Sequence, residues 1–142
     1  NGLASAMASA GIQACHRAAQ AEAPRITGPE GGYAALFMTH PTAPDAVTSS
    51  ASIETKTSRG TRLSSAFFAP TNGGGCDLGV DTVEFRPKSC QDVALDDLQI
   101  DKPLPAIGER VQVVRFSATH HLYLMRVAGG CISIDKELRF AK

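Results

Sequence analysis

Histidines are the side chains of this chain best suited to proton transfer or metal binding, and there are four of them: His16, His40, His120 and His121. Only His120 and His121 are close together, and adjacent residues of a strand point to opposite sides of it, which disfavours a shared metal ion. His16 directly follows Cys15, so on a helix their side chains diverge by about 100° and cannot form a nucleophile–base pair. We therefore expect no metal site and no histidine-based catalytic site.

Cysteines offer a second kind of chemistry, and they are spread from the first helical segment to the last strand-like segment: Cys15, Cys76, Cys90 and Cys131. No C-x-x-C motif is present, which disfavours a zinc knuckle or a thioredoxin-like site. Two disulfides are the simplest interpretation, each contributing about 2–4 kcal/mol, and they predict an oxidising compartment, meaning the periplasm, the cell surface or the exterior. The alternative is four buried thiols in a cytosolic protein. Of the three possible pairings, Cys76–Cys90 is closest in sequence, and Cys76–Cys131 is an equal candidate because both cysteines follow glycine runs.

The remaining candidate motifs have simpler interpretations. The glycine run at 73–75 lacks the Lys-Ser/Thr and the spacing of a phosphate loop, so we interpret it as a turn. The acidic residues between 92 and 101 lack the alternation and the glycine of an EF-hand and favour a solvated helix face. No G-x-S-x-G or S-x-x-K motif is present. We expect neither a metal nor another cofactor, and a protein that is not an enzyme.

Composition excludes several further classes of protein. Fourteen Lys and Arg residues balance fourteen Asp and Glu residues, and this neutral charge argues against binding to nucleic acid or to anionic lipid. No segment approaches the roughly 18 consecutive apolar residues that a membrane span needs. The length of 142 residues suits one domain, residues 1–142.

Alanine dominates the first 23 residues, and the absence of proline before Pro24 predicts one N-terminal helix within 1–23, from about residue 3 to residue 22. Its apolar stripe consists mostly of methyl groups, so it can approach a sheet closely. Cys15 would pin this helix to the body of the domain. Because the chain begins with Asn1 rather than Met, we expect a processed form from which a signal peptide or a membrane anchor was removed.

Residues 33–140 are predicted to form mainly an antiparallel sheet, because strand-like segments follow one another through short turns. The predicted strands are 33–39, 47–57, 61–69, 80–85, 109–116, 121–127 and 131–136. Ser89 is a candidate N-cap for a short inserted helix at 90–98. We predict an α+β fold in which the N-terminal helix covers one face of the sheet and the hydroxyl-rich face of 48–56 is open.

These observations favour a non-enzymatic, extracytoplasmic module that binds another protein, of a periplasmic accessory, inhibitor or immunity, or envelope-assembly type. Its candidate surface combines the exposed strand face with two arginines that could be cross-strand neighbours: Ser50, Ser52, Glu54, Arg115 and Arg126. One alternative is a pilin-like filament subunit, because an alanine-rich helix precedes a sheet. Another is a small hydrolase, which would have a pocket where His120 or His121 meets an Asp or Cys from another segment. The oligomeric state stays open.

Overall fold

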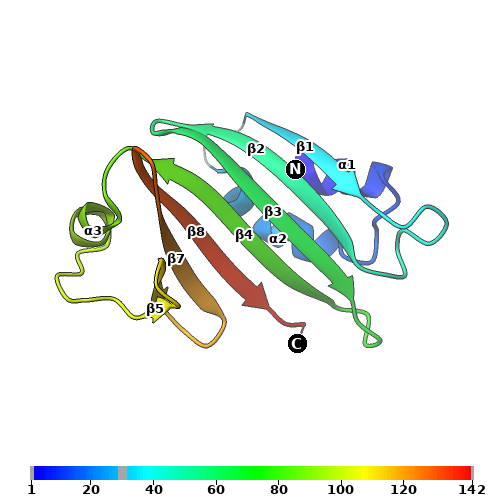
Figure 1. Ribbon diagram of the computed structural model, residues 1–142. Helices are drawn as coiled ribbons and strands as arrows, with labels where there is room; N and C mark the ends of the chain where they lie inside the picture. Colours follow the sequence, from blue (N-terminus) through cyan, green and yellow to red (C-terminus); the bar gives the residue numbers. More distant parts are fainter. Residues whose placement is uncertain (1, 29–31, 142) are drawn as a thin grey trace.

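The computed structural model describes residues 2–28 and 32–141 (Figure 1). The helical elements are α1 (Gly2–Ser9), α2 (His16–Thr27), α3 (Cys90–Asp92) and the π-helix η1 (Val93–Asp97), which continues α3. The strands are β1 (Tyr33–Met38), β2 (Ser49–Thr57), β3 (Gly60–Pro70), β4 (Cys76–Arg86), β5 (Ala106–Ile107), β6 (Val111–Arg115), β7 (His120–Val127) and β8 (Gly130–Arg139). The helices of this part of the chain include none that is long and apolar enough to cross a membrane.

All eight strands belong to one antiparallel sheet with the order β1-β2-β3-β4-β8-β7-β6-β5. The last strand returns to the middle of the sheet, where β8 pairs with β4 and joins a four-stranded N-terminal half to a four-stranded C-terminal half. The predicted α+β fold, with helices on an antiparallel sheet and a short inserted helix, is therefore confirmed. Each pairing keeps one constant register, so alternate residues of every strand share a face.

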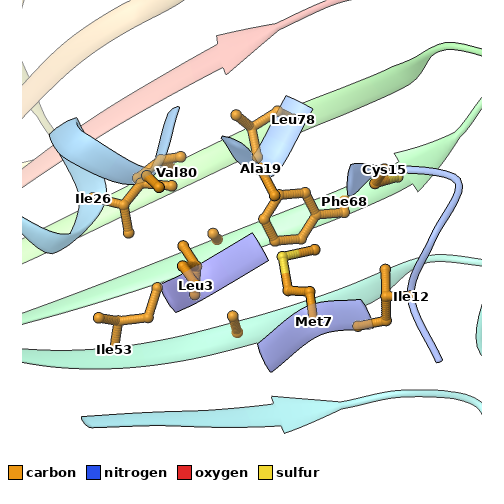
Figure 2. Close-up of a cluster of buried hydrophobic side chains, with 13 residues drawn as sticks. Leu3, Met7, Ile12, Cys15, Ala19, Ile26, Ile53, Phe68, Leu78 and Val80 are labelled. Carbon is orange, nitrogen blue, oxygen red and sulfur yellow. The ribbon is translucent and has the colours of Figure 1, made fainter. Parts of the chain in front are cut away.

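Helices α1 and α2 cover the N-terminal half of the sheet and lie behind β2–β4 in Figure 1. Their apolar side chains meet those of the strands in the larger of two hydrophobic clusters (Figure 2). Leu3, Met7 and Ile26 pack there against Ile53 and Phe68, and all five side chains are almost fully buried. Small residues such as Ala19 and Ala23 let α2 approach the sheet closely, as the alanine-rich sequence predicts.

The predicted single N-terminal helix is instead two helices. Gly11 has a φ of +85°, a conformation that ends α1, and α2 begins only at His16. Asp45 holds the segment just before α2, because its Oδ1 accepts hydrogen bonds from the backbone N–H groups of Gln13, at 2.6 Å, and Ala14. Alanine propensity alone does not show such a break. Helix α2 also continues past Pro24, which lies within its last turn, rather than ending before it.

A second helical cover lies over the C-terminal half of the sheet. The segment formed by α3 and η1 packs on β7 and β8, where Val93 contacts a smaller cluster that includes Leu122 and Leu124. The predicted N-cap is confirmed, since the Ser89 hydroxyl accepts a hydrogen bond from the backbone N–H of Asp92 at 3.0 Å. The two covers lie on the same face of the sheet, which we call the covered face; the other is the open face.

The predicted presence of two disulfides is confirmed, but both favoured pairings of Cys76 are wrong. The bonds are Cys15–Cys76 and Cys90–Cys131, with sequence separations of 61 and 41. Each bond joins a helical cover to the strand beneath it, the first tying the start of α2 to β4 and the second tying α3 to β8. Glycine runs before Cys76 and Cys131 do not bring the two cysteines together, because they lie on separate halves of the sheet.

The prediction that one face of the 48–56 segment is open is confirmed. In β2, Ala51 and Ile53 are fully buried on the covered face, whereas Ser52 and Glu54 lie on the open face. The two edges of the sheet differ, because β1 is six residues long and β5 only two. Within the described residues, β1 pairs only with β2, so its outer row of backbone groups is unpaired.

Candidate functional site

The open face carries two adjacent rows of apolar side chains that cross from β3 and β4 over the C-terminal half, and we call them the apolar patch. The register aligns Phe85, Ile132, Met125, Val111 and Ile107 in one row across five strands. It aligns Leu63, Val83, Ile134, Tyr123 and Val113 in the next row. Both rows point away from the two helical covers; Val113 is nevertheless buried, and most of the other side chains are half-buried.

Several side chains of the apolar patch are strongly exposed. Ile107 is 61% exposed, Phe85 49% and Leu63 46%. Scattered exposed apolar residues are ordinary on protein surfaces, whereas a contiguous apolar area marks a site of interaction. Because the strands hold these side chains in register, the apolar patch is preorganised and would lose little conformational entropy on binding.

A small apolar hollow, which we call the socket, lies elsewhere on the same open face. Gly79 forms its floor, and Phe67, Leu138 and Phe140 surround it with a volume of about 270 Å³. A Cβ atom on Gly79 would stand 3.2 Å from the Leu138 side chain, so the glycine keeps the socket open. Such a hollow suits one protruding apolar side chain of a partner protein.

Four of the five residues predicted as a partner surface lie on the open face, but they do not form one cluster. Ser50, Ser52 and Glu54 line β2 on that face, although Ser50 is itself buried. Arg115 ends β6 opposite His121, on the far side of the sheet from β2. The expected pairing of Arg115 with Arg126 is wrong. The register places Arg115 opposite His121 at one end of the β6–β7 hairpin, whereas Arg126 lies near the other end, opposite Cys131 and on the covered face.

A polar groove of about 370 Å³ lies on the covered face between α2 and η1. Its floor consists of polar side chains of the central strands: Arg62, Thr82, Glu84, Arg86, His120, Ser133, Asp135 and Glu137. Residues 82–86 of β4 and 132–137 of β8 therefore turn polar side chains such as Glu84 and Asp135 toward the covered side, and apolar side chains such as Phe85 and Ile134 toward the open side. Neither helical cover reaches this part of the floor, so solvent enters between them.

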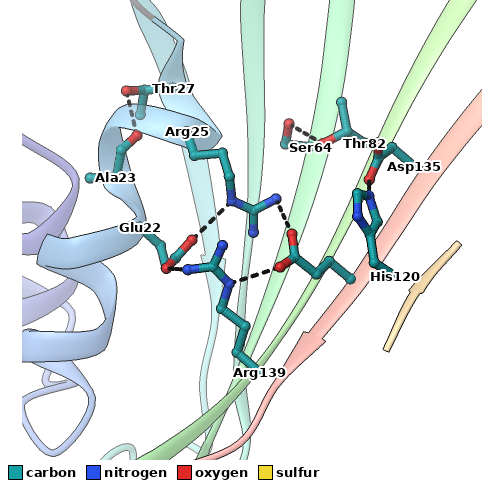
Figure 3. A network of polar contacts seen from close by, with 10 residues as sticks. Glu22, Ala23, Arg25, Thr27, Ser64, Thr82, His120, Asp135 and Arg139 are labelled. Carbon is teal, nitrogen blue, oxygen red and sulfur yellow. Dashed lines mark hydrogen bonds and ion pairs between the residues drawn. The ribbon is translucent and has the colours of Figure 1, made fainter. Parts of the chain in front are cut away.

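An ion-pair network joins α2 to β8 at one wall of the groove (Figure 3). Arg25 bonds to Glu22 at 2.9 Å and to Glu137 at 3.0 Å, and Arg139 bonds to the same two carboxylates. Burial raises the pKa of Glu137, but the hydrogen bond from Arg139 and the positive charges of Arg25 and Arg139 outweigh it. The pKa of Glu137 therefore lies below its ordinary value, which favours the charged carboxylate.

The opposite wall of the groove is held by a second set of ion pairs. Lys88 contacts Asp97 at 2.7 Å and Asp96 at 3.4 Å. The hydrogen bond from Lys88 lowers the pKa of Asp97, while burial opposes it more weakly. The same hydrogen bond raises the pKa of Lys88. The acidic run of the inserted helix is thus partly an ion-paired groove wall rather than wholly a solvated face.

His120 and Asp135 meet within the groove, where His120 Nε2 lies 2.9 Å from Asp135 Oδ1 (Figure 3). The His120 ring also packs against Phe116 with a centroid separation of 4.7 Å. His121 points to the open face and contacts Tyr123, so the two adjacent histidines are separated as predicted. No described Ser, Thr or Cys side chain hydrogen-bonds to the His120 ring, and all four cysteines form disulfides.

Over the ranges 2–28 and 32–141, no three His, Cys, Asp or Glu side chains are arranged to hold a metal ion. No family model, curated protein or solved structure matches this chain. The candidate sites are therefore two surfaces of the sheet: an apolar patch on the open face and a polar groove on the covered face.

Both surfaces escaped the sequence analysis for the same reason. Alternation in β4 and β8 shows that Val83 and Phe85 share a face, as do Ile132 and Ile134, but it does not show which face the helices cover. The usual assignment of apolar residues to the covered side is reversed here. The polar residues that alternate with them, such as Glu84 and Asp135, could have revealed the reversal, because a face with so many charges cannot form an ordinary core.

Proposed function

We propose that this chain is a non-enzymatic protein-binding module that acts outside the cytoplasm and binds its partner through the open face of the sheet. The observation that carries the proposal is the apolar patch, which extends from β3 and β4 across the C-terminal half and points away from both helical covers. Interfaces of this kind exclude water from an apolar centre and keep polar groups at the rim.

The charged residues around the apolar patch supply such a rim. Asp81 and Lys136 form an ion pair at 2.8 Å on the open face, between the apolar patch and the socket. Arg115 borders the apolar patch at the end of β6, and Glu54 borders it on β2. The partner surface that fits is an apolar area with mixed charge at its border and one protruding aliphatic or aromatic side chain for the socket.

Two disulfides support the extracytoplasmic location. Such bonds persist where thiols are not kept reduced, in the periplasm, at the cell surface or outside the cell. A small sheet with two modest cores gains stability from these bonds, because they constrain the unfolded chain. An envelope accessory protein, an inhibitor or an immunity protein fits this combination of a stabilised scaffold and a preformed binding face.

Site-specific crosslinking tests the proposal. A photoreactive residue is placed at Ile107 or Phe85, and at Leu95 of η1 as a control, which is 50% exposed but belongs to neither surface. We expect both open-face positions, and not position 95, to crosslink one protein in native envelope extracts. That protein is then purified, and its dissociation constant is measured with the wild type and with three variants: Phe85→Glu, Ile107→Glu and Leu95→Glu.

The binding measurement decides the outcome. A buried charge in an apolar interface is costly, so we expect Phe85→Glu and Ile107→Glu to weaken binding by about 100-fold or more. Leu95→Glu should bind as the wild type does. Unchanged affinity in both open-face variants, with native circular dichroism spectra, would contradict the assignment of the apolar patch as the interface.

A small hydrolase is the second candidate, which the contact between His120 and Asp135 in the groove favours. In such an enzyme Asp135 would orient the ring and His120 would accept a proton from water. Hydrolysis of p-nitrophenyl acetate and p-nitrophenyl phosphate tests this function. Saturable turnover that disappears in His120→Gln and persists in His40→Gln supports it, and equal rates for wild type and His120→Gln exclude it.

A further inference from the structure

The groove on the covered face contains cationic hydrogen-bond donors that the described protein atoms do not use. The Arg86 side chain is only 13% exposed, and its Nη2 lies 2.6 Å from Glu84. Its Nε and Nη1 atoms are buried and have no hydrogen-bond partner within the described residues. Leaving a buried charged donor without an acceptor is costly, so this site favours an added acceptor.

Arg62 adds a second guanidinium to the groove, and unlike Arg86 it forms no ion pair with a described carboxylate. The register places it opposite Glu84 on the groove floor. Its hydrogen bonds go to neutral oxygens, since Nε donates to Thr55 Oγ1 at 3.1 Å and Nη2 to the Ile26 carbonyl at 3.3 Å. Arg59, at the mouth of the groove, is 61% exposed and lies 3.6 Å from Glu84. Three arginines thus converge around one carboxylate.

The other carboxylates that line the groove already have partners. Asp97 pairs with Lys88, and Glu137 pairs with Arg25 and Arg139. Asp135 is hydrogen-bonded to His120. Asp97 also lies 4.0 Å from Arg86 Nη1, too far for a hydrogen bond, so it compensates Arg86 only in part. No carboxylate forms an ion pair with Arg62, and Glu84 is shared with Arg59 and Arg86, so the region around Arg62 and Arg86 has a local excess of positive charge. Arginine pairs with carboxylate and phosphate oxygens through short, charge-assisted hydrogen bonds.

The remaining wall of the groove is apolar. Val93 and Leu98 line it from the inserted helix, and Leu122 and Phe116 line it from the β6–β7 hairpin. The groove therefore offers an anion site next to an apolar wall. Its volume of about 370 Å³ is at the lower end of the range for small-molecule sites, which reaches roughly 300–1,000 Å³.

We propose that this groove binds a small anionic organic molecule, with its carboxylate or phosphate group held by Arg62 and Arg86 and its apolar part against Val93, Leu98 and Phe116. This site lies on the opposite face of the sheet from the apolar patch, so the inference does not depend on the protein-binding function. Arg59 receives the anion at the mouth, where its exposed side chain is free to move.

Four probes separate the contributions of the anion and of the apolar part: benzoate, phenyl phosphate, neutral benzyl alcohol and inorganic phosphate. Isothermal titration calorimetry of the intact, oxidised protein measures their dissociation constants. We expect saturable one-to-one binding of benzoate or phenyl phosphate, and binding of benzyl alcohol weaker by about 10-fold or more because it lacks the charge-assisted hydrogen bonds. Inorganic phosphate alone should also bind more weakly, since it gains nothing from the apolar wall. The stronger of the two aromatic anions identifies the oxyanion class.

Two variants place the binding in the groove. Arg86→Gln removes the buried guanidinium, and Arg59→Gln removes an exposed cation whose loss leaves the core untouched, so it reports even where Arg86→Gln fails to fold. Arg110→Gln is the matched control, because Arg110 is exposed on the β5–β6 turn and lies outside this groove. We expect Arg86→Gln to weaken binding by about 10-fold or more, Arg59→Gln by about 3-fold, and Arg110→Gln not at all.

Backbone amide shifts of labelled protein give an independent readout. Saturating phenyl phosphate should move the resonances of Thr82, Ser133 and Leu98 in the groove, and leave those of Ile107 and Ile132 on the open face unchanged. The proposal is overturned by any of three results: no probe binds at millimolar concentration, benzyl alcohol binds as tightly as the anions, or the shifts appear only outside the groove.

Discussion

The two halves of the sheet use their faces in opposite ways. In the N-terminal half, β2 and β3 place Ile53 and Phe68 under the helices and Ser52 toward the open side, as in an ordinary two-layer fold. In β8 of the C-terminal half, and in residues 82–86 of β4 beside it, charged residues lie on the covered side and residues such as Ile132 and Ile134 lie on the open side. One half is organised for stability, and the other is organised around surfaces that remain available.

This difference has an energetic meaning. The N-terminal half has the larger cluster of fully buried side chains, so it supplies most of the apolar burial. The C-terminal half has a smaller cluster and is held mainly by the Cys90–Cys131 bond and by the ladder between β4 and β8. Apolar residues that an ordinary fold would bury stay outside, which has a stability cost that binding of a partner can recover.

Two phenylalanines on opposite faces give the strongest test of this comparison. Phe68 is fully buried in the N-terminal half, whereas Phe85, at the end of β4 that pairs with the C-terminal half, is 49% exposed on the open face. We expect Phe68→Ala to lower the free energy of unfolding by about 3–5 kcal/mol, because it leaves a cavity. Phe85→Ala should lower it by less than about 1 kcal/mol while weakening partner binding. Urea denaturation measures both, and equal losses of stability would remove the distinction between the halves.

The two disulfides, one in each half of the sheet, provide a second test of the difference between the halves. Replacing Cys90 and Cys131 by alanine should cost about 2–4 kcal/mol, as should replacing Cys15 and Cys76. The distribution of the loss should differ. Hydrogen exchange should accelerate mainly in residues 90–104 of the first variant, because the small cluster there depends on its bond. In the second variant exchange should accelerate across α2 and the central strands together. Identical exchange patterns would show that the halves unfold as one unit.

Acid should act on the ion pairs that connect the α2 cover to the groove. Because the folded pKa of Glu137 lies below its ordinary value of 4.5, its charged form stabilises the fold above that pH. The contribution is lost as pH falls through the lower folded pKa. We expect Glu137→Gln to be less stable than the wild type at neutral pH, with the difference shrinking as pH falls below about 4.5. Urea denaturation between neutral and acidic pH measures it, and a difference independent of pH would contradict the assignment.

Charge reversal at two arginines gives the smallest expected effect. Arg115 lies beside the apolar patch and Arg126 lies on the covered face, so only the first should affect the partner complex. We expect Arg115→Glu to weaken binding by about 2- to 5-fold, the range for an exposed interfacial charge, and Arg126→Glu to leave it unchanged. Equal effects of both substitutions in the purified complex would place the interface elsewhere.

Local patterns predicted most of the secondary structure, because alternation in segments such as 49–57 and the cap at Ser89 are properties of neighbouring residues. The hairpin between β2 and β3 and the three final strands follow from the same signals. The break at Gly11 was missed because the alanine-rich composition favours helix on both sides of it. Asp45, which binds the backbone N–H groups of residues 13 and 14 after the break, is distant in the sequence. A helix-forming composition does not reveal contacts that another segment supplies.

The disulfide pairing and the site depend on the tertiary arrangement and could not be read from local signals. The bond between Cys15 and Cys76 requires α2 to lie over β4, and Cys90 meets Cys131 because α3 lies over β8. To predict that polar residues of β4 and β8 face the helical side of the sheet, one must know where the two helical covers end. Ser52 and Glu54 were placed on the correct face because β2 has one polar alternation, whereas Arg126 was misplaced because the register of its hairpin was unknown.

The unequal edges of the sheet limit how copies of this chain could associate. A strand added at β1 finds six residues to pair with, but at the opposite edge β5 offers only two. Indefinite stacking of sheets side by side needs two edges of comparable length, one to donate and one to accept. Among the described strands, β1 is thus the edge best able to pair with another copy, and a twofold β1-to-β1 pair would occupy that edge in both molecules and leave no long edge for further growth.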